Sequence, residues 1–440
     1  MRDSQSTEQQ PPMGPHFLYS ALPKGISGMA LLSATVRGVS AFLWPVLFLI
    51  AAQFLVPSVA LLPPSLVGLK TWGPILALAL TGAMAVGFNR GRVAFAVVSL
   101  ACAFIAYKLF LQRGETDFAA RAVFAAVCLF TPLNLTVLAV LRERGVFTFY
   151  GTRRLGTIVL EVLVMAWIVT QQQPQMVEWI YLPLFDSTSA AATRIPQVAL
   201  LIMLMGIAVT VVDAVINRSA IDAGFAVALV AFAIGCNGVE TPNHFAVYCG
   251  VSALILGIAL LKDAYRLAFH DELTGLPSRR ALNERLMSLG AHYTIAMLDV
   301  DHFKTFNDTH GHELGDQVLR MVAASIERVG GGGRAFRYGG EEFVVLFPGK
   351  RLHEAWSHLE AVRLEIAAYR LGIRGPDRPK QPPPERPGAV RHPAVQAVSV
   401  TISAGVAERN GRFATPESVL NAADEAMYRA KQKGRNRTSH

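Results

Sequence analysis

The hydrophobic positions follow two different patterns, which divide the chain near residue 262. Upstream of this point, apolar runs of about 17–23 residues recur, and runs of this length can cross the roughly 30 Å hydrocarbon core of a bilayer as helices. We predict eight such spans, over residues 42–62, 72–88, 93–111, 119–141, 155–172, 195–216, 221–237 and 243–261. Downstream, short β-rich runs alternate with amphipathic helical patterns, which is typical of an α/β domain.

The downstream pattern places individual elements. A turn at 271–278 leads into a helix, and Ser278 is expected to be its N-cap because a serine hydroxyl can accept from the first free amides. We then expect a strand at 293–298, a polar stretch at 302–312, a helix at 313–329, a hairpin at 334–347, a helix at 353–371, a strand at 398–403 and a helix at 416–432. Residues 374–395 contain seven prolines and many charges, so we predict a flexible insertion without secondary structure.

The composition supports this division. Of the 440 residues, 52% are hydrophobic and 17% are charged, whereas a soluble domain carries about 25% charged residues. The deficit is concentrated in residues 41–261, which hold 21 charged side chains, against 47 in residues 262–440. We therefore predict a cytoplasmic N-terminal segment at 1–40, a membrane domain at 41–261, a short helical linker at 262–270 and an α/β domain at 271–440.

These numbers also exclude some classes of protein. A disordered, fibrous or disulfide-scaffold protein would not combine this hydrophobic content with so few cysteines. All four cysteines lie in apolar stretches without metal-ligand spacing, and we expect them to be buried small hydrophobes: Cys102, Cys128, Cys236 and Cys249.

The net charge of +9 does not by itself indicate a nucleic-acid partner, because basic residues also determine membrane topology. One side of the eight predicted spans carries Arg90, Arg92, Arg142, Arg144, Arg153, Arg154, Arg218, Lys262 and Arg266. The other side carries only Lys70, Arg113 and Arg194. We therefore expect both termini in the cytoplasm, the chain in the inner (cytoplasmic) membrane, and no nucleic-acid partner. The polar first 12 residues predict no cleaved signal peptide.

The membrane half offers few groups for chemistry. Glu161 and Asp213 fall near the predicted cytoplasmic ends of their spans, so we interpret them as interfacial carboxylates. His244 is the only histidine in 41–261, which argues against paired-histidine haem or metal ligation. The outward loop at 173–194 is a candidate ligand site, but no ligand follows from it. A transporter should show internal repeats and polar clusters at mid-membrane. Neither is evident, so a lipid-embedded sensor or anchor with an unknown sensory ligand is favoured.

Charged residues of the downstream domain gather near strand and helix ends. Asp299 follows a buried strand, at the end where open α/β sheets place their sites, and Glu341 and Glu342 occupy a glycine-rich tight turn. Carboxylate oxygens suit Mg²⁺, which usually also keeps waters and substrate phosphate oxygens. Lys431 and Arg435, near the end of the last helix, can neutralise phosphates. Each signal alone is also typical of a plain turn or hairpin, whereas the set is a minimum for metal-assisted phosphoryl transfer.

Five segments of this domain occur in a distinctive order. They are Asp271-x-Leu273-Thr274-Gly275-Leu276, LDVDHFKTFNDTHGHELGDQVL at 298–319, RYGGEEF at 337–343, VTISAGVA at 400–407 and ADEAMYRAKQKGRN at 423–436. Together they resemble the GGDEF domain, the catalytic domain of diguanylate cyclases, over about 175 residues. The expected fold class is an α-helical transmembrane domain of about eight spans followed by an α/β (α+β, nucleotidyl-cyclase-like) GGDEF domain.

The resemblance implies a membrane-bound diguanylate cyclase, which condenses two GTP into cyclic di-GMP and two pyrophosphates. Each domain of a homodimer would hold one GTP, and each 3′-hydroxyl would attack the α-phosphate of the other nucleotide. The implied cofactor is Mg²⁺, with Mn²⁺ as the alternative cation. A catalytically silent GTP-binding signalling or scaffold protein is the second interpretation, and the retained carboxylates weigh against it.

The resemblance also implies roles in metal binding and catalysis. Asp299, the backbone carbonyl of Val300 and Glu341 would ligate the metal. Glu341 would help to deprotonate the 3′-hydroxyl, and Glu342 would support a second metal. Arg337 would add positive charge near the transferring phosphorus. All of these residues match motif positions in this sequence.

Substrate binding is implied in the same way. Asn307 and Asp316 would hydrogen-bond the guanine edge, where a carboxylate can accept from the N1–H and the exocyclic amine. Adenine has no such pair of donors and would leave Asp316 unpaired. The β- and γ-phosphates would be held by the backbone amides around His302 and Phe303 and by the side chains of Lys304, Lys431 and Arg435.

Two departures from the family pattern stand out. Ser278 replaces a frequent asparagine, and both residue types cap helices, so we expect little effect. The family's product-inhibition site is Arg-x-x-Asp, and the matching positions here are Gly330 and Gly333. Inhibition by this route should therefore be absent, and a role as a cyclic di-GMP receptor through this site is disfavoured. The insertion at 374–395 is read as a tolerated surface loop.

Overall fold

The structure is a computed structural model that describes residues 42–54, 68–112, 117–184, 193–217, 219–372 and 397–440. The chain divides into two compact units, Met1–Leu261 and Lys262–His440. The predicted N-terminal segment at 1–40 and the predicted insertion at 374–395 fall outside the described residues.

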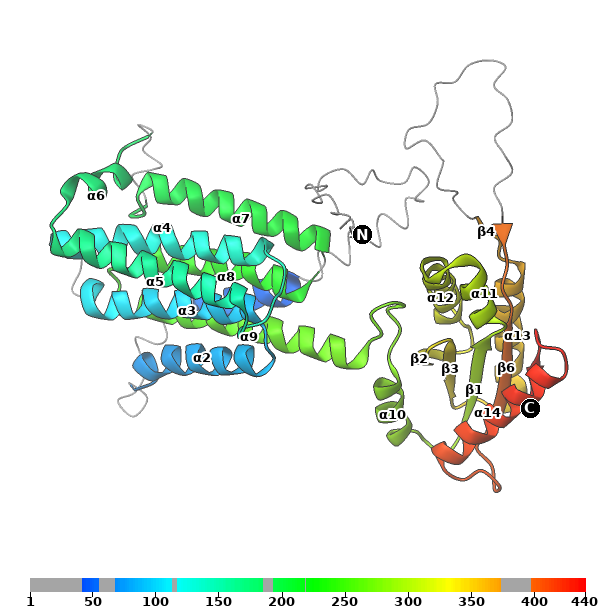
Figure 1. Ribbon diagram of the computed structural model, residues 1–440. Helices are drawn as coiled ribbons and strands as arrows, with labels where there is room; N and C mark the ends of the chain where they lie inside the picture. The colour runs from blue at the N-terminus through cyan, green and yellow to red at the C-terminus, as the bar shows by residue number, and fades with distance from the viewer. Residues whose placement is uncertain (1–41, 55–67, 113–116, 185–192, 218, 373–396) are drawn as a thin grey trace, which may run out of the picture. The chain divides into compact units, whose positions relative to one another are not determined.

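The described part of the first unit is built from helices (Figure 1). They are Phe42–Phe54, α2 (Gly68–Gly87), α3 (Gly91–Ala106) with its π-helical extension η2 (Tyr107–Leu111), α4 (Phe118–Val140), α5 (Phe149–Thr170), α6 (Pro174–Ile180), α7 (Gln197–Asn217), α8 (Ala220–Asn237) and α9 (His244–Phe269). Polar residues fix two of the helix starts: Asp117 accepts from the amide of Ala120 in α4, and Thr148 from that of Gly151 in α5.

Five of these helices are long and apolar enough to cross a membrane, judged by length and composition: Gly91–Leu111, α4, α7, α8 and α9. The first two predicted spans correspond to shorter apolar helices, Phe42–Phe54 and Thr71–Gly87. The predicted span at 155–172 corresponds to α5, which begins earlier and includes Arg153 and Arg154. A domain of eight spans therefore stays a prediction.

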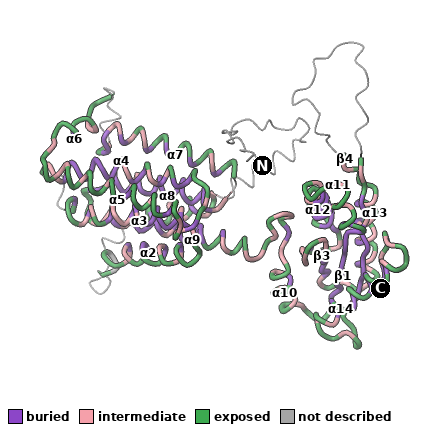
Figure 2. The backbone as a smooth tube through the Cα atoms, in the orientation of Figure 1, coloured by how far each residue is buried: buried purple, intermediate pink, exposed green. Residues whose placement is uncertain are grey.

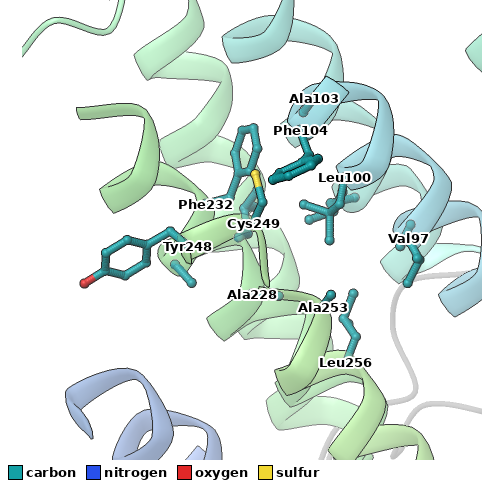
Figure 3. Packing of buried hydrophobic residues seen from close by; sticks show 14 of the residues in the cluster. Val97, Leu100, Ala103, Phe104, Ala228, Phe232, Tyr248, Cys249, Ala253 and Leu256 are labelled. Carbon is teal, nitrogen blue, oxygen red and sulfur yellow. The ribbon is translucent and has the colours of Figure 1, made fainter. Parts of the chain in front are cut away.

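The core of this unit includes the packing of α3, α8 and α9 (Figure 3). Leu100 of α3, Phe232 of α8 and Cys249 of α9 are fully buried in it. By contrast, many residues of α5 and α7 are exposed (Figure 2). They include leucine, valine and isoleucine residues of both helices. Gly151 and Ile158 are the only buried residues of α5. Exposed apolar surface of this extent is costly in water, which supports an apolar environment for these helices.

Three side chains of this unit differ from their predicted surroundings. Arg92, expected in a loop, lies in α3, and its guanidinium binds Asp222 of α8 at 2.5 Å and the carbonyl of Leu138 at 2.8 Å. Glu161, expected near the end of a span, lies near the middle of α5, because this helix begins at Phe149. Cys102 is half-buried, whereas the other three cysteines are buried as expected. Local hydrophobicity does not reveal long-range partners such as those of Arg92.

The second unit is an α/β domain with a five-stranded sheet in the order β2-β3-β1-β6-β7. The strands are β1 (Tyr293–Val300), β2 (Arg334–Gly339), β3 (Glu342–Pro348), β6 (Ile402–Glu408) and β7 (Thr438–Ser439), with β4 (Leu371–Gly372) and β5 (Ala397–Val398) forming a separate pair. The helices are α10 (Arg279–Met287), α11 (Phe303–His310), α12 (His312–Glu327), α13 (Leu352–Ala368) and α14 (Pro416–Gln432). The central strand β1 pairs antiparallel with both β3 and β6.

Alternate residues of β1 enter different cores on the two faces of the sheet. Leu298 and Val300 pack in a cluster with residues of α12 and α13. Ile295 and Met297 pack in a second cluster with residues of α10 and α14. This two-sided burial explains why β1 is a continuous apolar run and could be predicted from sequence.

Three expectations for this unit need correction. The strand expected at 398–403 is displaced, since the main strand β6 begins at Ile402. The polar stretch at 302–312 contains helix α11. Ser278 does occupy the N-cap position of α10, but its hydroxyl donates to the carbonyl of Ala268 at 3.3 Å instead of capping the helix. β6 is rich in Ser, Gly and Ala, which favour strands weakly, so burial and not local propensity decides its position.

Gly405 lies where β6 approaches the backbone of α14. A Cβ at this position would lie 2.0 Å from the amide nitrogen of Met427 and 2.1 Å from the carbonyl oxygen of Ala423. Backbone atoms cannot move aside as the end of a flexible side chain can. Only glycine therefore allows α14 to lie this close to the sheet.

We predict that Gly405→Ala lowers the stability of the second unit by about 1–3 kcal/mol through overpacking. For a domain of this size, the Tm should fall by roughly 3–10 °C. Thermolysin digestion of the full-length protein in detergent, over a range of temperatures, would measure this. Gly411→Ala is the matched control, since a Cβ there meets nothing within 4 Å. Equal Tm values for the two variants would contradict the prediction.

Candidate active site

The C-terminal end of β1 meets the turn between β2 and β3. Asp299 lies opposite Glu342 in the antiparallel register of β1 and β3, and the amide of Val300 donates to the carbonyl of Glu341 at 3.3 Å. Gly340 has φ +37°, a backbone conformation that glycine adopts easily. Strand pairing and a tight turn thus bring three carboxyl groups to one strand end.

Burial and neighbouring negative charge disfavour the ionisation of these carboxyl groups. Asp299 is only 5% exposed. Burial raises its pKa above the ordinary value, and the ammonium of Lys431, 2.9 Å from Oδ2, offsets this only in part. Burial also raises the pKa values of Glu341 and Glu342, and the charge of Asp299 raises both further. A cation placed among them would stabilise the ionised forms.

The donor set fits a hard divalent cation that is completed by substrate. Among the described residues, no group of three or more His, Cys, Asp or Glu side chains is arranged to hold a metal ion unaided. Mg²⁺, however, is usually bound through one or two carboxylates together with waters and substrate phosphates. Asp299, Glu341 and the carbonyl of Val300 form an incomplete set of this kind. These are the residues that would hold the ion.

Arg337 binds the turn between β2 and β3 through the backbone. Its Nη1 forms an ion pair with Asp271 at 2.6 Å, and its Nε and Nη2 donate to the carbonyl of Gly340 at 3.2 and 2.7 Å. Burial acts to raise the pKa of Asp271, but hydrogen bonds from Thr274 and Arg337 outweigh it and lower the pKa. These contacts indicate that Arg337 positions the turn, and the predicted charge near the transferring phosphorus stays a prediction.

A polar atom without a partner lies on α11. The side-chain oxygen Oδ1 of Asn307 is buried and has no hydrogen-bond partner among the described residues. This oxygen packs against Gly315 of α12. A Cβ added to this glycine would lie only 1.8 Å from the oxygen. Asp316 is the next residue and is half-exposed. A buried acceptor without a donor is costly, so this place favours a ligand that supplies an N–H group.

The start of α11 has an unusual backbone. His302, at the N-cap position, has φ 57° in the left-handed region, which is uncommon for a residue other than glycine. The amides of Phe303 and of the residues that follow lack carbonyl partners within the helix, and amides in this position bind anions. Lys304 is exposed in the first turn and adds positive charge.

Asp301 is a site residue to which the sequence analysis gave no role. Its buried carboxylate accepts from the hydroxyls of Thr401 at 2.7 Å and Ser403 at 2.6 Å and from the amide of Asn436 at 3.0 Å. The last contact fixes the turn after α14, where Arg435 has φ 62°. Asp301 lies within the quoted LDVD motif, but its partners are at least 100 residues away in the sequence.

The second unit also matches a known family. The family described as diguanylate cyclase, GGDEF domain, matches residues 268–382 and 389–437. The second unit carries a GGDEF domain. The motifs that suggested this domain from the sequence all lie within the matched region.

Relatives of the GGDEF domain occur in several bacteria. The chain is 38% identical over 185 residues to diguanylate cyclase DgcP of Pseudomonas aeruginosa, which covers 40% of this chain and 24% of that protein. It is 37% identical over 187 residues to response regulator PleD of Caulobacter vibrioides, which covers 40% and 37%. A solved structure, the coiled coil and GGDEF domain of DgcB from Caulobacter crescentus in complex with c-di-GMP, is 34% identical, with a TM-score of 0.35, covering 41% of this chain and 88% of that chain. The matched part of the chain thus spans less than two fifths of the length of DgcP and of PleD.

The GGDEF domain arranges the predicted site residues in three groups. The end of β1 brings together Asp299, Val300, Glu341, Glu342 and Lys431. Arg435 is close enough for its charge to lower the pKa of Asp299. The start of α11 holds His302, Phe303 and Lys304, and the α11–α12 contact holds Asn307 and Asp316. The functional roles of all these residues stay predictions.

The raised pKa of Glu342 has a consequence for stability. Burial and the nearby charge of Asp299 raise this pKa, so the ionised side chain destabilises the fold at neutral pH. We predict that Glu342→Gln, in the presence of a chelator, raises the Tm of the GGDEF domain by about 1–3 °C. The gain should shrink as the pH falls through the raised pKa, because the wild-type carboxyl group is then protonated as well.

Proteolysis of the full-length protein over a range of temperatures and pH values would measure this effect. Glu272→Gln is the control, since Glu272 is exposed and lies outside the carboxyl cluster. It should leave the Tm nearly unchanged at every pH. A lower Tm for Glu342→Gln than for wild type at neutral pH would show that Glu342 stabilises the fold and would overturn this account.

Proposed function

We propose that the protein is a membrane-bound diguanylate cyclase that condenses two GTP into cyclic di-GMP and two pyrophosphates. The observation that carries the proposal is the cluster of Asp299, Glu341 and Glu342 beside Lys431, within a domain of the GGDEF family. The similarity to DgcP, which is named a diguanylate cyclase, supports the same reaction.

Glu341 is the proposed proton acceptor. A carboxylate with a raised pKa binds a proton more readily than an ordinary one, and this suits a group that takes the proton from the attacking 3′-hydroxyl. The 3′-oxygen forms a bond to the α-phosphorus of the other GTP, and pyrophosphate leaves. Lys431 and Arg435, with the amides at the start of α11, hold the negatively charged phosphates.

Mg²⁺, with Mn²⁺ as the alternative, would supply positive charge at the phosphate oxygens and at the attacking oxygen. Asp299, Glu341 and the carbonyl of Val300 would hold it, and Glu342 would support a second ion. The raised pKa values of the carboxyl groups are consistent with a cluster that is stabilised by added positive charge.

Guanine recognition is proposed for Asn307 and Asp316. The partnerless Oδ1 of Asn307 can accept from the exocyclic amine of guanine, and the carboxylate of Asp316 can accept from N1–H. Adenine lacks both donors at the corresponding positions, so ATP would leave both acceptors without these partners. One domain holds one GTP, and attack on a second nucleotide therefore requires a second copy of the chain, a homodimer.

The membrane location belongs to the same proposal. Five helices of suitable length and the exposed apolar rows of α5 and α7 support insertion into a bilayer. The excess of arginine on one side of the predicted spans supports a cytoplasmic position for both termini and for the GGDEF domain. We propose eight spans in the inner membrane.

We predict that the full-length protein in nanodiscs forms cyclic di-GMP from GTP and Mg²⁺ and that Glu341→Gln lowers the rate by about 10²- to 10⁴-fold, the usual contribution of a general base. Chromatography of the nucleotide products gives the measurement. Glu272→Gln is the matched control and should retain wild-type activity. If the wild type binds GTP but forms no product under any cation tested, the silent GTP-binding interpretation is favoured instead.

The turn at 330–333 supports a second functional prediction. A Cβ on Gly330 would lie 2.8 Å from the ring of His358, and one on Gly333 would lie 2.7 Å from Phe347. These neighbours leave little room for the Arg-x-x-Asp pair that the family uses for product inhibition. We predict that added cyclic di-GMP leaves the initial rate unchanged, as measured by pyrophosphate release. Strong inhibition at low product concentration would show that the protein has another inhibitory site.

A further inference from the structure

A partly open cavity of about 460 Å³ lies between helices of the first unit. It is lined by α3 with its extension η2, by α4 and by α5, and its walls are almost entirely apolar, with side chains such as Phe110, Val127 and Met165. Ligand pockets in proteins have volumes of about 300–1,000 Å³ and apolar walls with a few polar groups. The cavity has the size and the character of such a pocket.

A chain of polar groups opens into this apolar space. Oε2 of Glu161 accepts from Nδ2 of Asn134 at 2.7 Å, and the same nitrogen lies 3.3 Å from the hydroxyl of Ser99. Glu161 and Ser99 both line the cavity, and Glu161 is the only charged residue among the described residues that do so. Within the described part of the chain, the second oxygen of Glu161 has no hydrogen-bond partner.

The helices around the cavity depart from regular packing. α3 continues into the π-helix η2, which contributes Phe110 to the wall, and π-helical turns are frequent at functional sites. α4 contains Pro132, which removes one backbone donor from the helix. The opposite wall is α5, which buries few of its residues. The cavity is thus bounded by two helices with irregular turns and by α5, which carries the single carboxyl group.

A carboxyl group within an apolar wall is costly unless its oxygens are paired. Asn134 satisfies one oxygen of Glu161, and a ligand in the cavity can supply the donor for the other. A primary amine provides several N–H donors and a charge opposite to that of a carboxylate. The apolar walls require the remainder of the ligand to be a hydrocarbon body.

We propose that this cavity is a binding site for an apolar amine, held by an ion pair between its amino group and Glu161. The site does not depend on the activity proposed for the GGDEF domain. A lipid acyl chain that merely fills the space is the competing occupant, and it would need no carboxyl group.

Cys102 provides a native probe of occupancy. It lines the cavity and is half-buried, whereas the other three cysteines of the chain are buried. Methyl methanethiosulfonate should therefore modify Cys102 first, and mass spectrometry of the full-length protein in nanodiscs would follow the rate. The test ligand is 1-naphthylmethylamine, and its matched control is 1-ethylnaphthalene, in which a methyl group replaces the amino group.

We expect 1-naphthylmethylamine to slow the modification of Cys102 by about tenfold, and 1-ethylnaphthalene to slow it less than about twofold, because the charge-assisted hydrogen bond supplies the difference in affinity. Glu161→Gln should abolish the protection by the amine. The ratio of rates with and without ligand is compared within each variant, since removing the charge also changes the reactivity of Cys102 itself.

Asp213→Asn is the matched variant. Asp213 also accepts from an asparagine side chain, that of Asn217, but it does not line the cavity, so this variant should keep the wild-type protection. Slow modification of the buried Cys128, Cys236 and Cys249 in every variant would show that the helices remain packed. Equal protection by the two naphthalenes, protection that persists in Glu161→Gln, or no protection at all would overturn the proposal.

Discussion

The burial of three neighbouring carboxyl groups at the end of β1 is the constraint on which the arrangement of the GGDEF domain depends. Strand pairing and a glycine turn bring Asp299, Glu341 and Glu342 together, although burial and mutual charge make their ionisation unfavourable. The surrounding structure compensates for this cost. Lys431 approaches from α14, and Arg337 holds the turn through the carbonyl of Gly340.

The position of Lys431 depends in turn on two features far from it in the sequence. Gly405 allows α14 to pack against the backbone of β6, and the carboxylate of Asp301 fixes the turn that follows α14. A small residue and a buried acid thus set the distance between the helix that carries Lys431 and the strand end. The stability of the domain and the geometry of its site share the same contacts, so the two cannot vary independently.

Much of this could be predicted from the sequence, because the relevant signals are local. The apolar run of β1 and the amphipathic pattern of α14 follow from short-range periodicity, and the Gly-Gly turn follows from backbone sterics. The position of β6 could not be predicted, because its Ser and Gly residues form a strand only when α14 and β1 cover them. The role of Asp301 depends on partners at least 100 residues away, and no local pattern records such a distance. In the first unit, the same limit concealed the Arg92–Asp222 ion pair and the position of Glu161 near the middle of α5.

The ion pair between Asp299 and Lys431 has a further consequence for ligand binding. In a cyclase of the proposed kind, the cation would take the carboxylate and the nucleotide phosphates would take the ammonium, so the pair must separate before either partner is fully used. The ligand that binds first loses the free energy needed to break the Asp299–Lys431 ion pair. The second ligand then binds to a side chain that is already free of this ion pair. By thermodynamic reciprocity, each ligand raises the affinity for the other by the same factor. In such a cyclase, a single salt bridge would thereby make nucleotide and metal binding cooperative within one domain.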